Sequence, residues 1–169
     1  MPETNARPPP TAPAGASPPV EGRRQVYLHA GQLVSAAEPT AVTTILGSCV
    51  SVCLFDPVSG VGGMNHFLLP LHVGRDQSLR FGTVAVPELV DALVRAGARR
   101  GALRAKVFGG ASVIGAFRHR RNLGEENAAL AEQLLADAAI PVLERDVGGQ
   151  RGRKVIFHTD DGAAWVRPL

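Results

Sequence analysis

The sequence predicts one compact domain of the α/β or α+β class, with a mixed β-sheet or sandwich core flanked by two or three helices. The chain has 169 residues, of which 45% are hydrophobic and 20% charged, and this is enough for one core of ordinary size. Short β-branched stretches bounded by glycine or proline recur along most of it, and two longer stretches have the period of amphipathic helices.

Short apolar stretches bounded by turn residues predict seven strands after residue 40. The clearest turn is DPVSG at 56–60, and the two strands that flank it are expected to form a hairpin. Further apolar residues at strand-like spacing, in QVYLHAGQLVSAA, place the start of the folded domain near Arg23. The predicted strands are 41–46, 50–56, 61–68, 103–110, 140–147, 153–158 and 163–167.

Two segments have the apolar period of helices. The first is 83–98, in which Pro87 is tolerated if it falls in the first turn. The second is 122–138, where Asn122 and Glu125 form a capping box. The inward faces are expected to carry Val86, Leu89, Val90, Leu93 and Val94 in the first helix, and Leu130, Leu134 and Ala138 in the second.

The chain divides into a tail and a domain. Residues 1–22 hold seven of the thirteen prolines and almost no large apolar side chains, which predicts disorder, and 23–169 form the domain. No apolar run reaches the roughly 18 residues of a membrane span. The start of the sequence has no apolar stretch behind a positive charge, so a secretory signal is not expected. We therefore expect a cytoplasmic protein without membrane insertion.

The positive charge of the chain is concentrated in one region. The net charge is +3 and the pI about 9.4, and residues 92–124 contain eight Lys or Arg and no Asp or Glu. Such a region suits nucleic acid or an acidic protein surface, or it is simply a set of solvated arginines. Because aromatic residues are not interleaved with the basic ones, nucleic-acid binding is not expected.

The two cysteines, Cys49 and Cys53, lie in a predicted strand, which excludes several roles. Four residues of extended chain span about 13 Å, whereas a disulfide needs Cα atoms within about 7 Å. The same separation argues against a shared zinc ion, and neither GxxxxGK[ST] nor GxGxxG is present. We expect no metal and no cofactor.

Cys49 and His66 are the candidate nucleophile and base. Cys49 follows Gly47 and Ser48 at the start of a strand, where a glycine bend favours an accessible thiol, while Cys53 lies deeper and is expected to be inert. His66 lies on the second arm of the predicted hairpin and could reach across to Cys49. On these residues alone, an inert cysteine and a nucleophile both remain open.

The motifs resemble the CheD family of chemoreceptor glutamine deamidases. The resemblance runs from about Val42 to Val166, and the pairing of LGSC with GGMNHF seventeen residues later is its most specific part. Where family members have a glycine a few residues before an Arg-Asn pair, this chain has the basic run RHRRN at 118–122. The motifs are LGSCVSVCLFDP, GVGGMNHFLLP, RFG, AKVFGGA, RN at 121–122 and DVGGQRGRKVIF.

The resemblance implies a catalytic triad. Cys49 is then the nucleophile, His66 the base, and Thr43, which has Thr44 beside it, the residue that orients the imidazole. Thr43 could also be an ordinary β-branched strand residue. The oxyanion or substrate cleft is expected at Ser48, Asn65, Gly109 and Gly110, of which the glycines could equally be tight turns.

The resemblance also implies the reaction and the partners. The expected activity is conversion of glutamine to glutamate on methyl-accepting chemotaxis receptors through a Cys49 thioester, with receptor methyl esters as a second substrate. A CheC-type phosphatase is an expected partner. The alternative is a non-catalytic regulatory module that docks the receptor or the phosphatase. A mass change of about one dalton per modified site distinguishes catalysis from docking.

Overall fold

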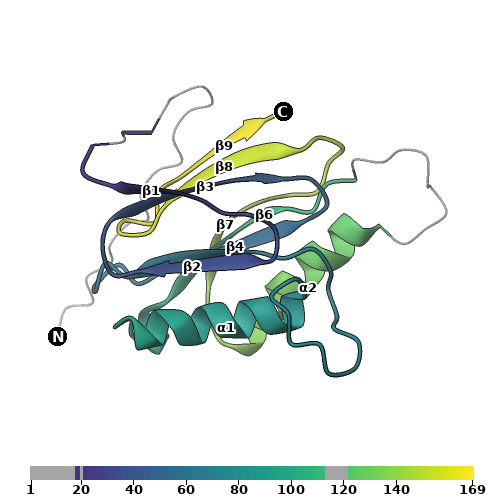
Figure 1. The fold of residues 1–169 in the computed structure, drawn as a ribbon, viewed down its shortest axis with the longest axis horizontal. Coiled ribbons are helices and arrows are strands. Elements are labelled where there is room, and N and C mark those ends of the chain that lie inside the picture. Colours follow the sequence, from purple (N-terminus) through teal and green to yellow (C-terminus); the bar gives the residue numbers. More distant parts are fainter. Residues whose placement is uncertain (1–17, 20, 113–121) are drawn as a thin grey trace.

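The computed structural model describes residues 18, 19, 21–112 and 122–169. Within these residues, nine strands, two α-helices and one short 3-10 helix form three layers (Figure 1). A four-stranded sheet packs on one face of a five-stranded sheet, and both α-helices cover the other face of the five-stranded sheet (Figure 1). The predicted α+β class with a sandwich core is therefore confirmed. Most of the predicted tail, 1–22, lies outside the described residues.

The four-stranded sheet has the order β1-β3-β8-β9. Strand β1 runs parallel to β3, and the other neighbours are antiparallel. The strands are β1 (Arg24–Tyr27), β3 (Thr40–Leu46), β8 (Arg153–His158) and β9 (Ala164–Pro168). Three of them match predicted segments, and β1 lies in the apolar stretch that was expected to open the domain.

The five-stranded sheet has the order β2-β5-β4-β6-β7, in which only β6 and β7 are parallel neighbours. The predicted hairpin is confirmed as β4 and β5, joined by the turn after Phe55. The strands are β2 (Gln32–Ala36), β4 (Val50–Phe55), β5 (Gly62–His66), β6 (Arg104–Gly109) and β7 (Val142–Val147). Between β3 and β4, residues 47–49 carry the chain from one sheet to the other.

Helix α1 (Gly82–Arg95) lies against β2, β4 and β5, and is followed by the 3-10 helix η1 (Arg100–Ala102). Four of its five predicted inward residues are buried, but Val94 is exposed. The helix begins at Gly82, one residue earlier than predicted, and Pro87 lies in its second turn and not in the first. Because proline has no N–H, it cannot bond to the Thr83 carbonyl one turn earlier.

Helix α2 (Leu123–Asp137) begins as predicted but buries a different face. The Asn122 side chain accepts a hydrogen bond from the Glu125 N–H, which confirms the cap. The predicted inward residues were wrong: Ala138 is exposed, and Leu130 and Leu134 are only half-buried. Small residues let the helix approach the sheet closely, and the buried face consists of Gly124, Asn127, Ala128, Ala131 and Leu135.

Strand β4 is buried on both faces. Val50, Val52 and Leu54 face the helices, in the first of two apolar clusters. Cys53 and Phe55 point the other way, into a second apolar cluster between the sheets. The sequence predicted a core on the valine face alone. That expectation was incomplete, because the four-stranded sheet covers the cysteine face as well.

One buried ion pair lies in the layer between the sheets. Lys106 on β6 is 2% exposed, and its Nζ lies 3.0 Å from Glu144 Oε2 on the neighbouring strand β7. Lys106 is also the cross-strand partner of Cys53. An ammonium group at this depth needs its carboxylate, since a lone buried charge is far more costly than a pair.

We expect Glu144→Ala to destabilise the fold more than Lys106→Met does. The first change leaves an unpaired buried ammonium and should cost about 3 kcal/mol. The second replaces the charge with an apolar side chain of similar length and should cost less than about 1.5 kcal/mol. Urea unfolding followed by circular dichroism measures both, and a smaller loss for Glu144→Ala would contradict this account of the pair.

Candidate functional site

The three carbonyl groups of the bend at 47–49 each accept a hydrogen bond from another part of the chain. Gly47 O accepts a hydrogen bond from Ala111 N at 2.9 Å, and Cys49 O accepts one from Gly110 N at 2.8 Å. Between them, Ser48 O accepts a hydrogen bond from the side-chain amide of Asn127 at 3.0 Å. The backbone on both sides of the Cys49 thiol is therefore fixed by groups from the loop after β6 and from α2.

Gly109 and Gly110 support this bend through close backbone contact. Both have positive φ, 108° and 68°. A Cβ on Gly109 would lie 2.2 Å from Cys49 O, and one on Gly110 would lie 2.6 Å from Gly124 O. Only glycine fits at these positions. The Gly110 N–H is already bonded to Cys49 O, so this residue shapes the nucleophile bend and its amide is not free for an oxyanion.

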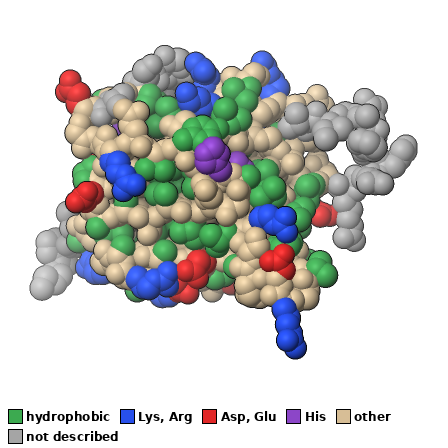
Figure 2. Space-filling view, viewed as in Figure 1, with side chains coloured by type: hydrophobic (Ala, Val, Ile, Leu, Met, Phe, Trp, Pro, Cys, Tyr) green, Lys and Arg blue, Asp and Glu red, His purple; other side chains and the backbone are tan. Residues whose placement is uncertain are grey.

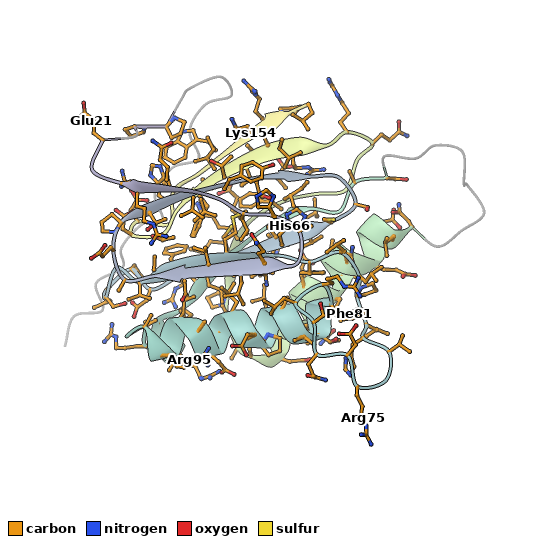
Figure 3. All side chains as sticks on the ribbon, viewed as in Figure 1. Glu21, His66, Arg75, Phe81, Arg95 and Lys154 are labelled. Atoms are coloured by element: carbon orange, nitrogen blue, oxygen red, sulfur yellow. The ribbon has the colours of Figure 1, made fainter. Side chains whose placement is uncertain are left out.

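The strand register places His66 on the same face as Cys49. Cys53 pairs with Met64 in the antiparallel β4–β5 ladder, and Val50 pairs with Phe67 in a separate antiparallel bridge that keeps the same register. This register sets His66 opposite Ser51. Cys49 lies two residues before Ser51, so its side chain points to the same face, between the sheets. Cys49 and His66 are therefore diagonal neighbours. Diagonal neighbours lie about 7 Å apart, within reach of a long side chain. Figure 3 shows His66 in the layer between the two sheets.

A chain of two hydrogen bonds sets the tautomer of His66. The Thr44 hydroxyl donates to the Leu28 carbonyl, with an oxygen–oxygen distance of 2.8 Å. Thr44 Oγ1 also lies 2.9 Å from His66 Nδ1. A hydroxyl has one proton, so Thr44 must accept from His66 and the imidazole carries its proton on Nδ1. Nε2 is left with its lone pair, as a general base requires.

The hydroxyl that hydrogen-bonds to His66 therefore belongs to Thr44 and not to Thr43, the residue that the sequence predicted. Thr44 is fully buried. Thr43 is half-buried and pairs with Tyr27 and Ile156 within the four-stranded sheet. Because side chains alternate along β3, Thr43 points away from the layer that holds His66. The structure brings Thr44 and His66 together, and it does not bring Thr43 to them.

Burial keeps both groups of the candidate pair neutral. It lowers the pKa of His66 to about 4, with a smaller contribution from the charge of His29. It also raises the pKa of Cys49 above that of an ordinary thiol, although the Cys49 N–H beside the sulfur opposes this. Near pH 7 the resting state is thus a thiol with a neutral imidazole.

The other predicted cleft residues divide into two groups. Asn65 lies on the helix side of β5, where its amide accepts from Val52 N at 2.8 Å and donates to Ala85 O at 3.1 Å. It is fully buried there and does not line the Cys49 face, so we withdraw it from the cleft. Ser48 stays beside the thiol in the bend. The Cys49 N–H lies against its own sulfur, where it favours the thiolate.

The basic region is partly neutralised in the fold. Arg95 pairs with Glu88 at 2.8 Å, and Arg100 pairs with Asp91 at 2.9 Å. Lys106 is buried with Glu144, as described above. Residues 118, 120 and 121 of the basic run lie outside the described residues. Figure 2 shows histidine side chains at the surface of one face, mainly among hydrophobic and uncharged atoms.

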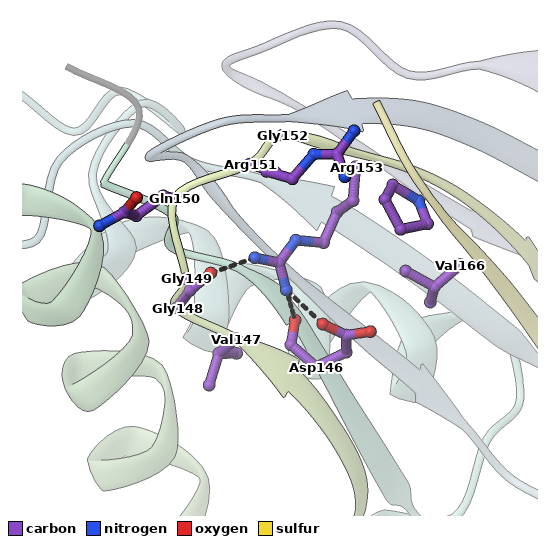
Figure 4. Close-up of a pocket in the computed structure, with 10 residues that line it drawn as sticks. Asp146, Val147, Gly148, Gly149, Gln150, Arg151, Gly152, Arg153 and Val166 are labelled. Carbon is purple, nitrogen blue, oxygen red and sulfur yellow. Dashed lines mark hydrogen bonds and ion pairs between the residues drawn. The ribbon is translucent and has the colours of Figure 1, made fainter. Parts of the chain in front are cut away.

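A separate pocket lies at the turn between β7 and β8. It is lined by residues 146–153 together with Val166 and Pro168 (Figure 4). The Arg153 guanidinium crosses this turn and donates to Asp146 and to the Gly148 carbonyl (Figure 4). Arg153 is therefore committed to holding the turn. Neither Cys49 nor His66 lines this pocket.

In the described part of the chain, no group of three or more His, Cys, Asp or Glu side chains is placed to hold a metal ion. No helix among these residues combines the length and apolar character of a membrane span.

Comparison with known proteins identifies the family. A family model described as CheD chemotactic sensory transduction matches residues 68–168. The chain is 72% identical over 167 residues to a protein of Anaeromyxobacter dehalogenans (strain 2CP-C) named "Probable chemoreceptor glutamine deamidase CheD 1", with 98% of each chain covered. This chain belongs to the CheD family, as the sequence motifs predicted.

More distant proteins are also similar. A protein of Agrobacterium fabrum (strain C58 / ATCC 33970) named "Probable chemoreceptor glutamine deamidase CheD" is 46% identical over 149 residues, covering 86% of this chain and 81% of that one. The solved structure of the Bacillus licheniformis hypothetical protein YfiH has a TM-score of 0.44 and 18% identity, over 68% of this chain and 49% of that one.

We expect iodoacetamide to alkylate Cys49 and to spare Cys53 in the folded protein. Cys49 is half-buried, whereas Cys53 is fully buried and its burial raises its pKa further. Because the pKa of Cys49 is itself raised, its alkylation rate should still increase above about pH 9, where the rate of an ordinary thiol levels off. Peptide mass spectrometry gives both rates. Equal labelling of the two cysteines without denaturant would contradict the assignment.

Proposed function

We propose that this chain is a glutamine deamidase that acts on chemoreceptors, with Cys49 as nucleophile and His66 as general base. The observation that carries the proposal is the hydrogen-bond chain through Thr44, which leaves His66 Nε2 unprotonated on the same face as Cys49. Family membership supports the reaction, since the relatives are named chemoreceptor glutamine deamidases.

The first half of the reaction forms a thioester. His66 Nε2 takes the Cys49 proton as the sulfur adds to the carboxamide carbon of a substrate glutamine. Because both groups rest neutral, this transfer accompanies the attack and does not precede it. The oxyanion is held by the Cys49 N–H. The imidazolium then protonates the departing ammonia, and the C–N bond breaks.

The second half regenerates the enzyme. Neutral His66 removes a proton from water, which attacks the thioester carbon and releases glutamate on the receptor and the Cys49 thiol. A glutamyl methyl ester would enter the same thioester with methanol as the leaving group. We therefore include receptor methyl esters as a second substrate of this site.

In this proposal Thr44 orients the imidazole. Its hydroxyl stabilises the Nδ1–H tautomer and faces the charge that develops on the ring. The expectation that Thr43 has this role stays a prediction, and the experiment below separates the two threonines. The resemblance adds a CheC-type phosphatase as a second partner at the mouth of the site and the cytoplasm as the working compartment.

We expect Cys49→Ala and His66→Ala to abolish deamidation of a purified receptor fragment, and Cys53→Ala to retain most of it. The intact mass of the receptor rises by about one dalton for each glutamine converted. Cys53 is the matched control because it is a thiol on β4, four residues after Cys49, in the apolar cluster against which Cys49 packs. Full activity in Cys49→Ala would refute the mechanism, and binding of receptor without any mass change would favour a docking module.

Thr44→Val should lower kcat by at least about tenfold, because the imidazole loses the acceptor that holds its tautomer. Thr44→Ser keeps the hydroxyl and should keep most of the activity. Thr43→Val is the matched control, since it makes the same change one residue earlier on β3. The reverse pattern, with loss in Thr43→Val and none in Thr44→Val, would assign the role to Thr43.

A further inference from the structure

We propose that Asn127 is a positioning residue that sets the separation between the nucleophile and the base. The inference rests on the proposed function, since it concerns the geometry of Cys49 and His66. Asn127 lies in the first half of α2 and is fully buried. Nothing in its sequence context distinguishes it from the other polar residues of that helix.

The two donors of the Asn127 amide join the two segments that carry the site. Nδ2 lies 3.0 Å from Ser48 O, in the residue before Cys49. The same nitrogen lies 2.8 Å from Leu68 O, two residues after His66. One NH₂ group thus bonds to the nucleophile bend and to the end of the strand that carries the base. The first segment comes just before β4 and the second comes just after β5.

The orientation of this amide is determined by its contacts. Its Oδ1 has no hydrogen-bond partner among the described residues. Turning the amide over would place that oxygen against two carbonyl oxygens and leave the buried NH₂ group without acceptors. Such an arrangement would lose two hydrogen bonds and add repulsion, so the observed orientation is strongly preferred.

A second contact couples α2 to the nucleophile. Gly124, three residues before Asn127, lies so close to Gly110 that a Cβ on it would be 2.3 Å from Gly110 O. Gly110 in turn donates to Cys49 O. The start of α2 therefore contacts the Cys49 bend by two routes, one through the Asn127 side chain and one through the paired glycines.

The consequence for catalysis follows from distance. Cys49 and His66 are diagonal neighbours, so small shifts of either segment change the approach of Nε2 to the sulfur. A displacement of about 1 Å in a reacting group can cost about a hundredfold in rate. Asn127 touches neither reacting atom and acts only by holding both segments in place.

The test compares Asn127→Ala with Asp56→Ala in the full chain. Asp56 is an equally buried side chain at the other end of β4, where it accepts from Val58 N and Arg99 N. Both variants should lower the melting temperature. Only Asn127→Ala should lower kcat for receptor deamidation by about tenfold or more, with KM changed less than about twofold.

Alkylation of Cys49 gives a readout that stability alone does not change. At pH 7 the iodoacetamide rate of Asn127→Ala should fall to that of His66→Ala, because the base no longer reaches the thiol. At a pH above the thiol pKa the variant and the natural protein should react alike. Asp56→Ala should keep the natural profile at both pH values.

Asn127→Asp tests whether Asn127 acts through its hydrogen bonds or only by filling space. It has the same shape but places carboxylate oxygens against two carbonyls, so its kcat should be lower than that of Asn127→Ala. The inference is overturned if Asn127→Ala keeps the natural kcat and alkylation profile, or if Asp56→Ala changes both equally. Retained deamidation in Cys49→Ala would instead overturn the proposed function, so the two failures are distinguishable.

Discussion

The candidate site depends on one hydroxyl that is shared between two sheets. Thr44 lies on β3 of the four-stranded sheet, whereas His66 lies on β5 of the five-stranded sheet. The Thr44 hydroxyl donates its single proton to the Leu28 carbonyl, so it must accept a hydrogen bond from the imidazole. The packing of one sheet on the other is therefore what defines the tautomer of the base. A sheet without its partner would present the same histidine without a defined tautomer.

The nucleophile depends on a different kind of constraint. Each carbonyl of residues 47–49 accepts a hydrogen bond from another segment, and two left-handed glycines let those segments approach. The thiol itself is left partly accessible at the corner where the chain changes sheets. Rigid backbone with an accessible side chain is the combination that a nucleophile requires, because ordering it in advance lowers the entropic cost of reaction.

Much of this arrangement could be predicted from local patterns. Strand β4, its hairpin with β5 and the positions of Cys49 and His66 follow from alternation and turn residues. The choice between Thr43 and Thr44 could not be made, because it depends on which face of β3 meets the other sheet, and both faces of β4 proved to be buried. The buried face of α2 was wrong for a similar reason: close contact of Gly124 with Gly110 outweighed the larger leucines.

The position of Leu28 has a consequence for how the protein could lose function. Leu28 follows directly after β1, which is an edge strand held by a short parallel pairing with β3. Edge strands have low local stability and open far more often than core strands do. Fraying of β1 would remove the Leu28 carbonyl from the Thr44 hydroxyl. The tautomer of His66 would then no longer be fixed, although the rest of the sandwich stays folded. Hydrogen exchange at the amides of β1 would then report catalytic competence more directly than the global melting temperature.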